Sequence, residues 1–410
     1  MNIKGVEITK QQISVFAIVW VCFLLSFVER LSIPTVLPLV SESLKMSAAQ
    51  GGSYMTAFYM GYVATQLPGG WLTDRFGYRK VLLCSFIIMG GFTMLMSTVT
   101  SYEVGFLYRV LAGIGSGAIF SSCLRAIFDW FPGKGRGTAV GFFQTSTSMG
   151  LTVVNLLVPF IARDHGWRFA VFIAGTLPII AFIFAWFMLK ERTANPSITA
   201  QVAVSHSGSF LENVSALFKN KNVMLLALSG FFANAATWGT AAWANTYMNK
   251  ELHVSLITAG TIMSIYGISA VISKPIAGIL GDIFSDKKHY LCGILLLCFA
   301  PALLWFGTNT DIQTLYILAP ILGVAAYMYS PLQNAYIGEI VPIHMSGTAA
   351  GFVNTIWQLG SMFCPFVIGL TIDKTNNYYY AFVMLALFAF LGGVTMMFIK
   401  NKKKNVCTEL

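Results

Sequence analysis

The stretch GTAVGFFQT, Gly137 to Thr145, returns almost unchanged 210 positions later as GTAAGFVNT, Gly347 to Thr355. The correspondence continues outward at the same offset, with the acid Asp129 opposite the acid Glu339. A repeat of this length is far too long for a solenoid. The sequence therefore predicts two homologous halves of one large architecture.

The composition shows which medium these halves occupy. Hydrophobic residues make up 56% of the 410 residues and charged residues only 10%, and the mean hydropathy is +0.70. So few charges cannot cover the surface of a soluble protein of this size. We therefore expect an integral membrane protein.

Twelve apolar runs are long enough to cross a membrane, because a spanning helix needs about 20 residues. The runs are about twice the length of a barrel strand and do not alternate in hydropathy, which excludes a membrane barrel. The sequence predicts an all-α membrane protein with twelve transmembrane helices in two pseudo-symmetric six-helix bundles. The predicted spans are 12–36, 50–71, 80–99, 104–128, 137–161, 168–189, 222–248, 255–280, 289–308, 314–337, 346–370 and 377–399.

The domain order follows from these runs: an N-terminal bundle at 1–189, a cytoplasmic linker at 190–221, a C-terminal bundle at 222–400 and a basic tail at 401–410. The Ser, Asn, Pro and Gln content of the linker is typical of a flexible segment. With both termini cytoplasmic, 17 lysines and arginines lie inside and 5 outside, as the positive-inside rule requires. We expect a multi-pass protein of the inner (plasma) membrane. Topology then explains most of the net charge of +10, and no nucleic-acid partner is expected.

The text QLPGGWLTDRFGYRK, residues 66–80, lies between the second and third runs and resembles the signature loop of the major facilitator superfamily. Twelve spans divided six and six by a central linker match that family along the whole chain. The resemblance implies two bundles related by an axis along the membrane normal, with one midplane cavity that opens alternately to each side. It also implies a secondary transporter in the lipid bilayer that needs no cofactor, and we expect a monomer.

The same resemblance implies a gate at the cytoplasmic end of the first half. Asp74 is expected to lie against the positive N-terminus of the helix in run 346–370. An arginine of the loop, Arg75 or Arg79, is expected to reach Asp129. The alternative is that these charges only follow the topology of the chain.

By pseudo-symmetry, the second half carries a matching latch. Asp282 would face the start of the helix in run 137–161, and Lys287 or Lys288 would meet Glu339. This loop has Ile283 where the first half has an arginine. We therefore expect the second latch to be weaker.

Charged residues inside the spans indicate the substrate, because an intramembrane charge is costly and suggests function by default. An arginine at cavity depth can hold a carboxylate or a phosphate with two parallel hydrogen bonds. Arg30 and Arg109 lie at similar depth, so the cavity favours an anion. The alternative for Arg30 is a buried ion pair that stabilises the bundle, and the alternative for Arg109 is a structural or coupling role. Arg125 and Lys274 lie near cytoplasmic ends, where they can extend to the interface, and Arg125 can pair with Asp129 four residues on. We assign both of them structural roles.

The sequence around Arg30, FVERLSIPTVLP, resembles the anion:cation symporter branch of the superfamily, which carries sugar acids and other small organic anions. The resemblance implies that Arg30 binds a carboxylate, that Tyr62 and Gln358 contact the substrate, and that Glu29 takes part in proton coupling. The chain departs from the branch where Ser116 replaces a glutamate, and also at position 147, where a threonine replaces a glutamine. Glu29 is then the only acid well inside the first bundle. We hypothesise that Arg30 keeps Glu29 ionised until an anion competes for the arginine; the alternative is a structural acid bonded to the backbone or to Arg109.

The second half supplies neutral donors and aromatic residues to the predicted site. Asn354 and Gln358 are four residues apart and share a helix face, which suits a pair that reads hydroxyl groups. Each candidate taken alone could equally pack helices together. The further candidates are Trp238, Trp243, Tyr327 and Asn334.

Three classes of function follow from these residues. The first is a transporter that imports a small organic anion together with H⁺, or with Na⁺. The second is an exporter or exchanger of a siderophore, drug or phosphorylated solute, and the third is a membrane receptor that binds a nutrient without moving it. An enzyme is not expected, because no histidine lies well inside a span and no nucleophile–base or metal constellation is visible.

Overall fold

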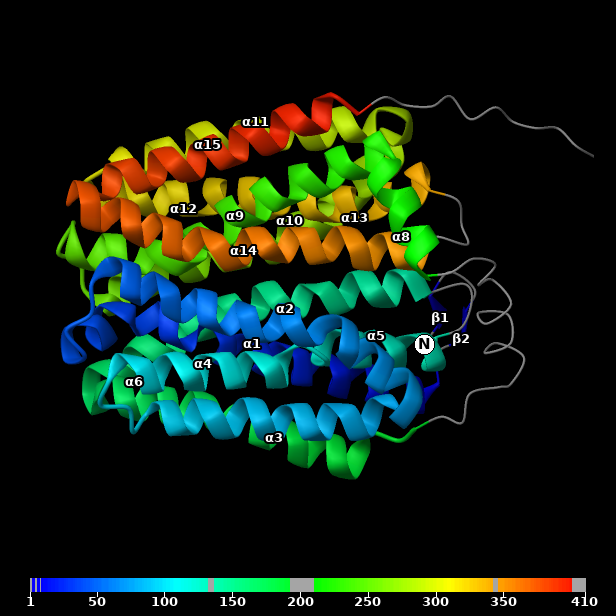
Figure 1. Cartoon of the computed structure of the whole chain (residues 1–410), viewed down its shortest axis with the longest axis horizontal. Coiled ribbons are helices and arrows are strands. Elements are labelled where there is room, and N and C mark those ends of the chain that lie inside the picture. Colours follow the sequence, from blue (N-terminus) through cyan, green and yellow to red (C-terminus); the bar gives the residue numbers. More distant parts are fainter. Residues whose placement is uncertain are drawn as a thin grey trace, which may run out of the picture.

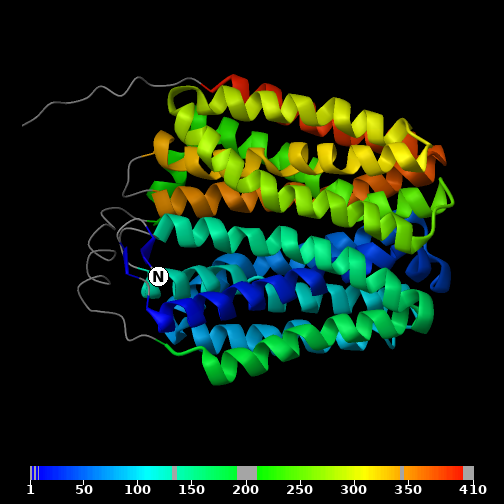
Figure 2. The same cartoon turned by 180° about the vertical axis from the view of Figure 1, so that it is seen from behind.

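The protein is described by a computed structural model that covers residues 2–3, 6–7, 9–131, 136–191, 210–341 and 346–399. Apart from one antiparallel pair of two-residue strands, β1 (Asn2–Ile3) and β2 (Val6–Glu7), the described chain is helical. The two halves of the sequence form two layers of roughly parallel helices (Figure 1 and Figure 2). This architecture is the predicted all-α arrangement of two bundles.

The first half contains six helices in the order of the chain. They are α1 (Lys10–Ser43), α2 (Ala48–Phe76), α3 (Tyr78–Met96), α4 (Tyr102–Ser116), α5 (Ile119–Trp130) and α6 (Arg136–Met188). The second half begins with a short helix and continues with seven longer ones and one 3-10 turn. They are α8 (Phe210–Lys219), α9 (Lys221–Lys250), α10 (Leu256–Ile283), η1 (Ser285–Lys287), α11 (Lys288–Thr308), α12 (Ile312–Tyr327), α13 (Tyr329–Ile340), α14 (Ser346–Thr375) and α15 (Tyr378–Met397).

Ten helical segments of the described chain are long and apolar enough to cross a membrane. One of them, Ala139–Met188, breaks at Gly166, whose φ of 80° is not helical, and so supplies two of the predicted spans. The remaining span is α2, whose polar and glycine residues keep it outside those ten. Together these helices account for the twelve predicted spans.

Two of the spans are broken at equivalent places, which the sequence did not reveal. The span Tyr102–Trp130 divides into α4 and α5 around Gly117, and the span Ile312–Ile340 divides into α12 and α13 at Met328. The first span also bends, because Val36 between Pro34 and Pro38 leaves helical geometry with φ −112° and ψ 15°. Proline removes a backbone donor and clashes with the preceding turn, which accounts for this bend.

Part of the predicted flexible linker is an ordered helix. The linker segment 192–209 lies outside the described residues, as does the tail at 401–410, but α8 occupies 210–219. Leu217 is buried, and the Phe218 ring packs edge-on against Phe352 of α14 with 4.7 Å between the centroids. Leu217 and Phe218 therefore dock this part of the linker on the second bundle, which corrects the expectation of flexibility there.

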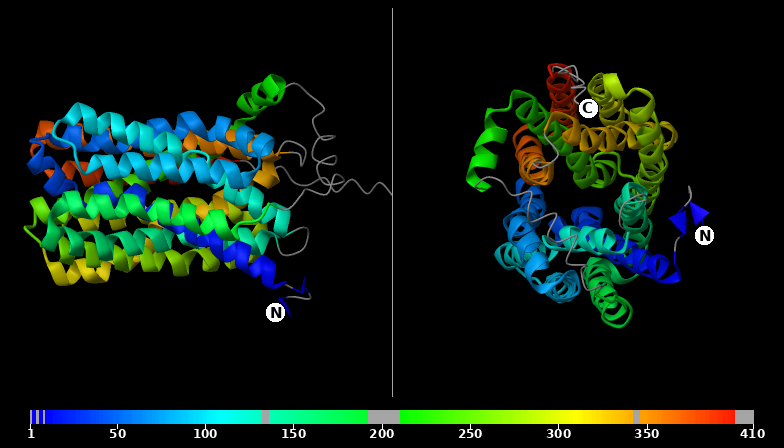
Figure 3. Two further views of the ribbon diagram at one scale, coloured as in Figure 1. Left: turned by 90° about the horizontal axis from the view of Figure 1, so that it is seen from below. Right: turned by 90° about the vertical axis from the view of Figure 1, so that its right-hand side faces the viewer.

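The two ends of the bundles differ in how tightly the halves meet. We call the end where α1 begins and α15 finishes the terminus end, and the opposite end the distal end (Figure 3). At the distal end, the Asp373 carboxylate of α14 accepts hydrogen bonds from the backbone N–H groups of Ala48 and Ala49 in α2, each at 2.8 Å. Gly52 of α2 packs directly on the backbone of Pro365. An ion pair between Lys250 and Glu42, at 3.3 Å, adds a further contact between the halves.

Towards the terminus end, α2 and α14 leave more open space between the halves. Gly70 of α2 and Gly351 of α14 have free space where a side chain would begin, and so do Gly141 of α6 and Gly278 of α10. The hydrogen bonds that the described residues of α2 make to α14 all lie between Ala48 and Thr56, in the distal half of α2. The halves are therefore closed together at the distal end and separated along α2 and α14 towards the terminus end.

Candidate functional site

A pocket lies between the two halves, near the middle of the spans. Helices α1, α2 and α4 of the first half and α9 and α14 of the second contribute its walls. It is thus placed where the resemblance implied a cavity. The lining residues are Arg30, Leu31, Met55, Phe58, Tyr59, Arg109, Trp238, Ala242 and Pro365.

Arg30 is the charged group at the centre of this pocket. Its side chain is 4% exposed, and its guanidinium carbon lies 4.3 Å from the Phe27 ring centroid and 4.5 Å from that of Tyr62. One terminal nitrogen donates to the Ser116 hydroxyl at 3.1 Å, while Nε has no partner. No carboxylate of the described residues lies within 4.0 Å of the group. Arg30 therefore has no carboxylate partner within this distance and has a donor to spare for an anion.

Close helix packing places the aromatic rings around Arg30. Phe27 precedes Arg30 by one turn of α1, so the two side chains share a face. Gly61 of α2 meets the backbone of Val110 in α4, and Gly113 of α4 meets the backbone of Phe58. Because neither glycine carries a side chain, α2 and α4 approach closely and hold Phe58 and its neighbours against the arginine.

Glu29 belongs to a separate buried cluster behind the pocket. It is fully buried, Thr93 donates a hydrogen bond to its Oε1, and Arg109 NH1 lies 4.0 Å from the same oxygen. Arg109 also donates to the backbone oxygens of Tyr54 at 3.2 Å and of Arg30 at 3.3 Å. The arginine that faces Glu29 is thus Arg109 and not Arg30, as in the structural alternative. Successive residues of a helix point about 100° apart, which explains why Glu29 and Arg30 diverge.

The second half brings two of its predicted aromatic residues to the site. The Trp238 ring lines the pocket and lies 5.9 Å from the Phe27 ring of the first half. Tyr327 is buried beside it, with 6.3 Å between the two ring centroids. Trp243 does not reach the pocket: its indole donates to the Pro365 oxygen at 3.0 Å, inside the second bundle. Trp243 therefore packs helices together in this structure.

The three predicted amides do not line the pocket either. Gln358 is half-buried and accepts a hydrogen bond from the Ser361 hydroxyl at 3.2 Å. Asn334 is exposed and donates to the backbone oxygen of Ser330 at 2.9 Å. Asn354 is half-buried on the same face of α14 as Gln358. Their predicted contact with a substrate remains a prediction.

Several aromatic residues around Arg30 were missed from the sequence. Phe27, Phe58 and Tyr59 surround the arginine, yet aromatic residues are frequent in every span and give no signal alone. Helical spacing was the available clue: Phe27 lies one turn from Arg30, and Tyr59 lies one turn from Tyr62. A search for aromatic residues one turn from the intramembrane arginine would have found Phe27.

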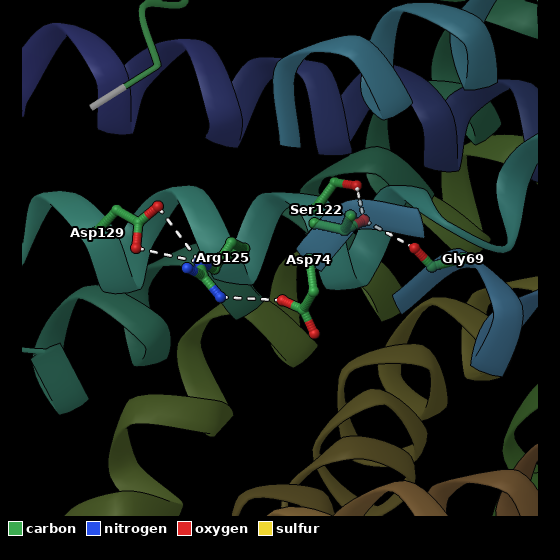
Figure 4. Close-up of polar contacts among 6 residues, drawn as sticks. Gly69, Asp74, Ser122, Arg125 and Asp129 are labelled. Atoms are coloured by element: carbon green, nitrogen blue, oxygen red, sulfur yellow. Dashed lines mark hydrogen bonds and ion pairs between the residues drawn. The ribbon is translucent and has the colours of Figure 1, made fainter. Parts of the chain in front are cut away.

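At the terminus end, Arg125 joins the two acids of the first half (Figure 4). It binds Asp74 with 2.9 Å between NH1 and Oδ1, and Asp129 with 3.1 Å between Nε and Oδ1. The predicted pairing of Arg125 with Asp129 is therefore present. The loop arginines make other contacts. The Arg75 guanidinium stacks on the Trp71 ring, 5.1 Å from its centroid, and Arg79 donates a hydrogen bond to the Trp186 backbone oxygen at 2.5 Å.

The matching pair of the second half joins Lys288 of α11 to Glu339 of α13. Lys287 is exposed, so Lys288 is the lysine that fulfils the predicted contact. The side chain of Asp282 lies outside the described residues. The ion pairs of Arg125 and of Lys288 each stay within one bundle, and Asp74 binds Arg125 instead of the start of α14.

Comparison with known proteins places this chain among transporters. The family model of the Major Facilitator Superfamily matches residues 19–249 and 226–407. The chain is 23% identical over 430 residues to the "Probable galactarate/D-glucarate transporter GarP" of Escherichia coli (strain K12), covering 96% of this chain and 95% of that protein. It is 24% identical over 403 residues to the "Probable sulfoacetate transporter SauU" of Cupriavidus necator, covering 94% and 93%. A crystal structure of a bacterial homolog of the human lysosomal transporter Spinster, inward-facing and occupied, superimposes with a TM-score of 0.80 at 16% identity over 95% of this chain and 97% of that one.

Proposed function

Because this chain belongs to the major facilitator superfamily, we propose that it is a secondary transporter that moves a small organic anion across the membrane by alternating access. Membership of a transporter family agrees with the expectation that the chain is not an enzyme. Two relatives bear names that specify sugar diacids and sulfoacetate as their cargo. An organic acid is therefore the substrate class that best fits both the family and the pocket.

The single observation that carries this proposal is the state of Arg30. A guanidinium that faces a pocket between the halves, without a carboxylate partner, is built to receive one. The rings of Phe27 and Tyr62 exclude water from it, which strengthens its attraction for an anion. A carboxylate can accept two parallel hydrogen bonds from such a fork.

Closure at only one end supports the alternating-access part of the proposal. With the terminus end in the cytoplasm, the distal contacts of Asp373 and Gly52 close the outer face. A rocking motion that brings Gly70 towards the start of α14 would close the inner face. The unfilled space at Gly70 and Gly351 leaves room for that approach.

We further propose that transport is coupled to protons through Glu29. Arg109 contacts Glu29 on one side and lines the pocket on the other, and it donates to the backbone oxygen of Arg30. A proton on Glu29 removes the negative charge that Arg109 faces, which frees Arg109 to interact with an anion in the pocket. Glu29→Gln should therefore exchange substrate across a liposome membrane but not accumulate it under a proton gradient. Accumulation by this variant with unchanged dependence on pH would exclude Glu29 as the coupling residue.

The primary experiment measures thermal stability of the purified protein across a panel of sugar acids, short carboxylates, aromatic acids, organophosphates and siderophores. A ligand at about 100 times its Kd stabilises the folded protein by about 2.7 kcal/mol. We expect a carboxylate to stabilise the wild type but not Arg30→Gln. Arg163→Gln is the matched control, since Arg163 is exposed, forms its ion pair with the neighbouring Asp164 and does not line the pocket. Stabilisation by non-anionic compounds alone, or an equal response of Arg30→Gln, would favour an exporter of another solute.

A further inference from the structure

A second cation without a carboxylate partner among the described residues faces the interface between the halves. Lys274 of α10 donates from Nζ to the Thr147 hydroxyl at 2.7 Å and to the Gln144 backbone oxygen at 3.2 Å, both on α6 of the other half. Its side chain thus points across the interface, which corrects the expectation that it extends to the cytoplasmic surface. Among the described residues no carboxylate lies within 4.0 Å of its ammonium group. Two neutral oxygens are its partners.

An unbroken strip of aromatic rings connects Lys274 to Arg30. The ammonium nitrogen lies 5.3 Å from the Tyr327 ring centroid, and Tyr327 packs edge-on against Trp238. Trp238 in turn lies 5.9 Å from Phe27, the ring that stacks under the Arg30 guanidinium. One cation from each half therefore stands at either end of one strip of rings, beside the pocket.

A second chain of contacts, through α6, also connects Lys274 to Arg30. Gly150 follows Thr147 by one turn of α6, so it lies about 5–6 Å further along the same face. Gly150 packs directly against Phe27. Lys274 is thus bonded one helical turn away from Gly150, which packs on Phe27, the residue whose ring Arg30 stacks against. Its flexible four-carbon stem lets the ammonium group move along the strip.

An intramembrane lysine without a counter-charge is costly to maintain. Neutral oxygens compensate an ammonium group less well than an anion does, because hydrogen bonds between charged partners are roughly twice as strong. The positions of both cations are therefore explained by a ligand that carries two negative charges. A monoanion on Arg30 would leave Lys274 uncompensated.

We propose that Lys274 is the second anion-binding residue of the transport site and that the substrate is an elongated dianion with an acid group at each end of its carbon chain. Arg30 binds one acid group and Lys274 the other, while the aromatic strip contacts the chain between them. This inference rests on the proposed function, because it takes Arg30 as the first anion-binding residue. It adds the substrate class and a residue of the second half.

The test compares acids that differ only in the second acid group. Purified full-length protein is titrated with D-glucarate against D-gluconate and with adipate against hexanoate, and affinity is taken from the thermal shift. A hydrogen bond to a charged group contributes about 1.5–3 kcal/mol, which corresponds to at least about tenfold in affinity. We expect the wild type to prefer the dianion of a pair by at least about tenfold. Lys274→Gln should lose that preference without weakening the monoanion, and Lys274→Arg should restore it.

The outcomes separate this inference from the proposed function. If acids bind in an Arg30-dependent way but the wild type shows no preference for the dianion, or Lys274→Gln weakens both members of a pair equally, then Lys274 only holds α6 against α10 and the inference is wrong. If Arg30→Gln leaves acid binding unchanged, the proposed function also fails.

A second variant keeps the inference testable if Lys274→Gln does not fold. Thr147→Val removes one of the two oxygens that hold the ammonium group in the absence of substrate. Dianions should then bind more tightly while monoanions are unaffected. An equal effect on both, or weaker dianion binding, contradicts the proposal.

Discussion

The carboxylate of Asp373 holds the distal end closed, and its removal gives a quantitative prediction. Its two oxygens accept the hydrogen bonds of Ala48 and Ala49, the first two N–H groups of α2, which have no partner inside their own helix. The Ser47 side chain accepts a hydrogen bond from the next N–H group, that of Gln50. The start of α2 is thus capped jointly by its own half and by the other half, and only the second contribution depends on closure.

The size of the effect follows from this geometry. A negative charge near a helix N-terminus contributes about 0.3–1 kcal/mol when exposed, and removing a capping oxygen typically costs about 1 kcal/mol. Asp373 is exposed, so water replaces its hydrogen bonds when the halves part. We expect Asp373→Ala to shift the balance towards the distal-open state by about 1 kcal/mol, which is about fivefold in the population ratio.

Spin labels at Lys45 and Asn309 measure this ratio, since these residues lie in distal turns of opposite halves. The longer label distance reports the distal-open state and the shorter one the distal-closed state. The ratio of the open to the closed population should rise about fivefold in Asp373→Ala. Asp311→Ala is the matched control, because Asp311 caps α12 within its own half through the Thr314 N–H at 2.9 Å. An unchanged distance distribution in Asp373→Ala, or the same change in both variants, would refute the reasoning.

Three further variants test other contacts. Gly52→Leu places a side chain against the Pro365 backbone, and the same label distances should show that the distal end no longer closes. Trp243→Phe removes the donor to the Pro365 oxygen. The free energy of unfolding should fall by about 1 kcal/mol, while the affinity for substrate should not change. Weaker substrate binding would place Trp243 in the site after all. Lys288→Gln and Glu339→Gln break the same ion pair, so the double variant should lose less stability in a thermal scan than the sum of the single variants, and additive losses would show that the pair does not couple.

The architecture could be predicted because it depends on patterns that span many residues. The repeat of GTAVGFFQT at GTAAGFVNT indicated two halves, and the length of the apolar runs gave the number of spans. The breaks at Gly117 and Met328 escaped notice, since neither interrupts the hydropathy of its run. The helix α8 was not predicted either, because the linker was judged by its average composition and not by the apolar residues of one ten-residue segment.

The site could be predicted only where one residue carries the chemistry. Arg30 was found because a charge inside a span stands out. Its surroundings were not, because the depth of a residue along a helix says little about the direction in which its side chain points. Lys274 shows this limit: counted from the end of α10 it lies near the surface, yet its side chain turns to α6. Ser116 and Thr147, identified as departures from the branch, prove to be neutral partners of Arg30 and Lys274.

The helix pair α2 and α14 suggests how the two ends of the protein are related. Helices α2 and α14 run antiparallel, and each carries an aspartate two residues before its last residue, Asp74 in α2 and Asp373 in α14. In the present state Asp373 caps the start of α2, while Asp74 is occupied by Arg125. If the halves rock about the pocket, the start of α14 approaches Asp74 as the start of α2 leaves Asp373. We therefore expect the two aspartates to cap in turn, one in each state. One such cap in each state keeps both states within reach of a substrate that binds between the halves.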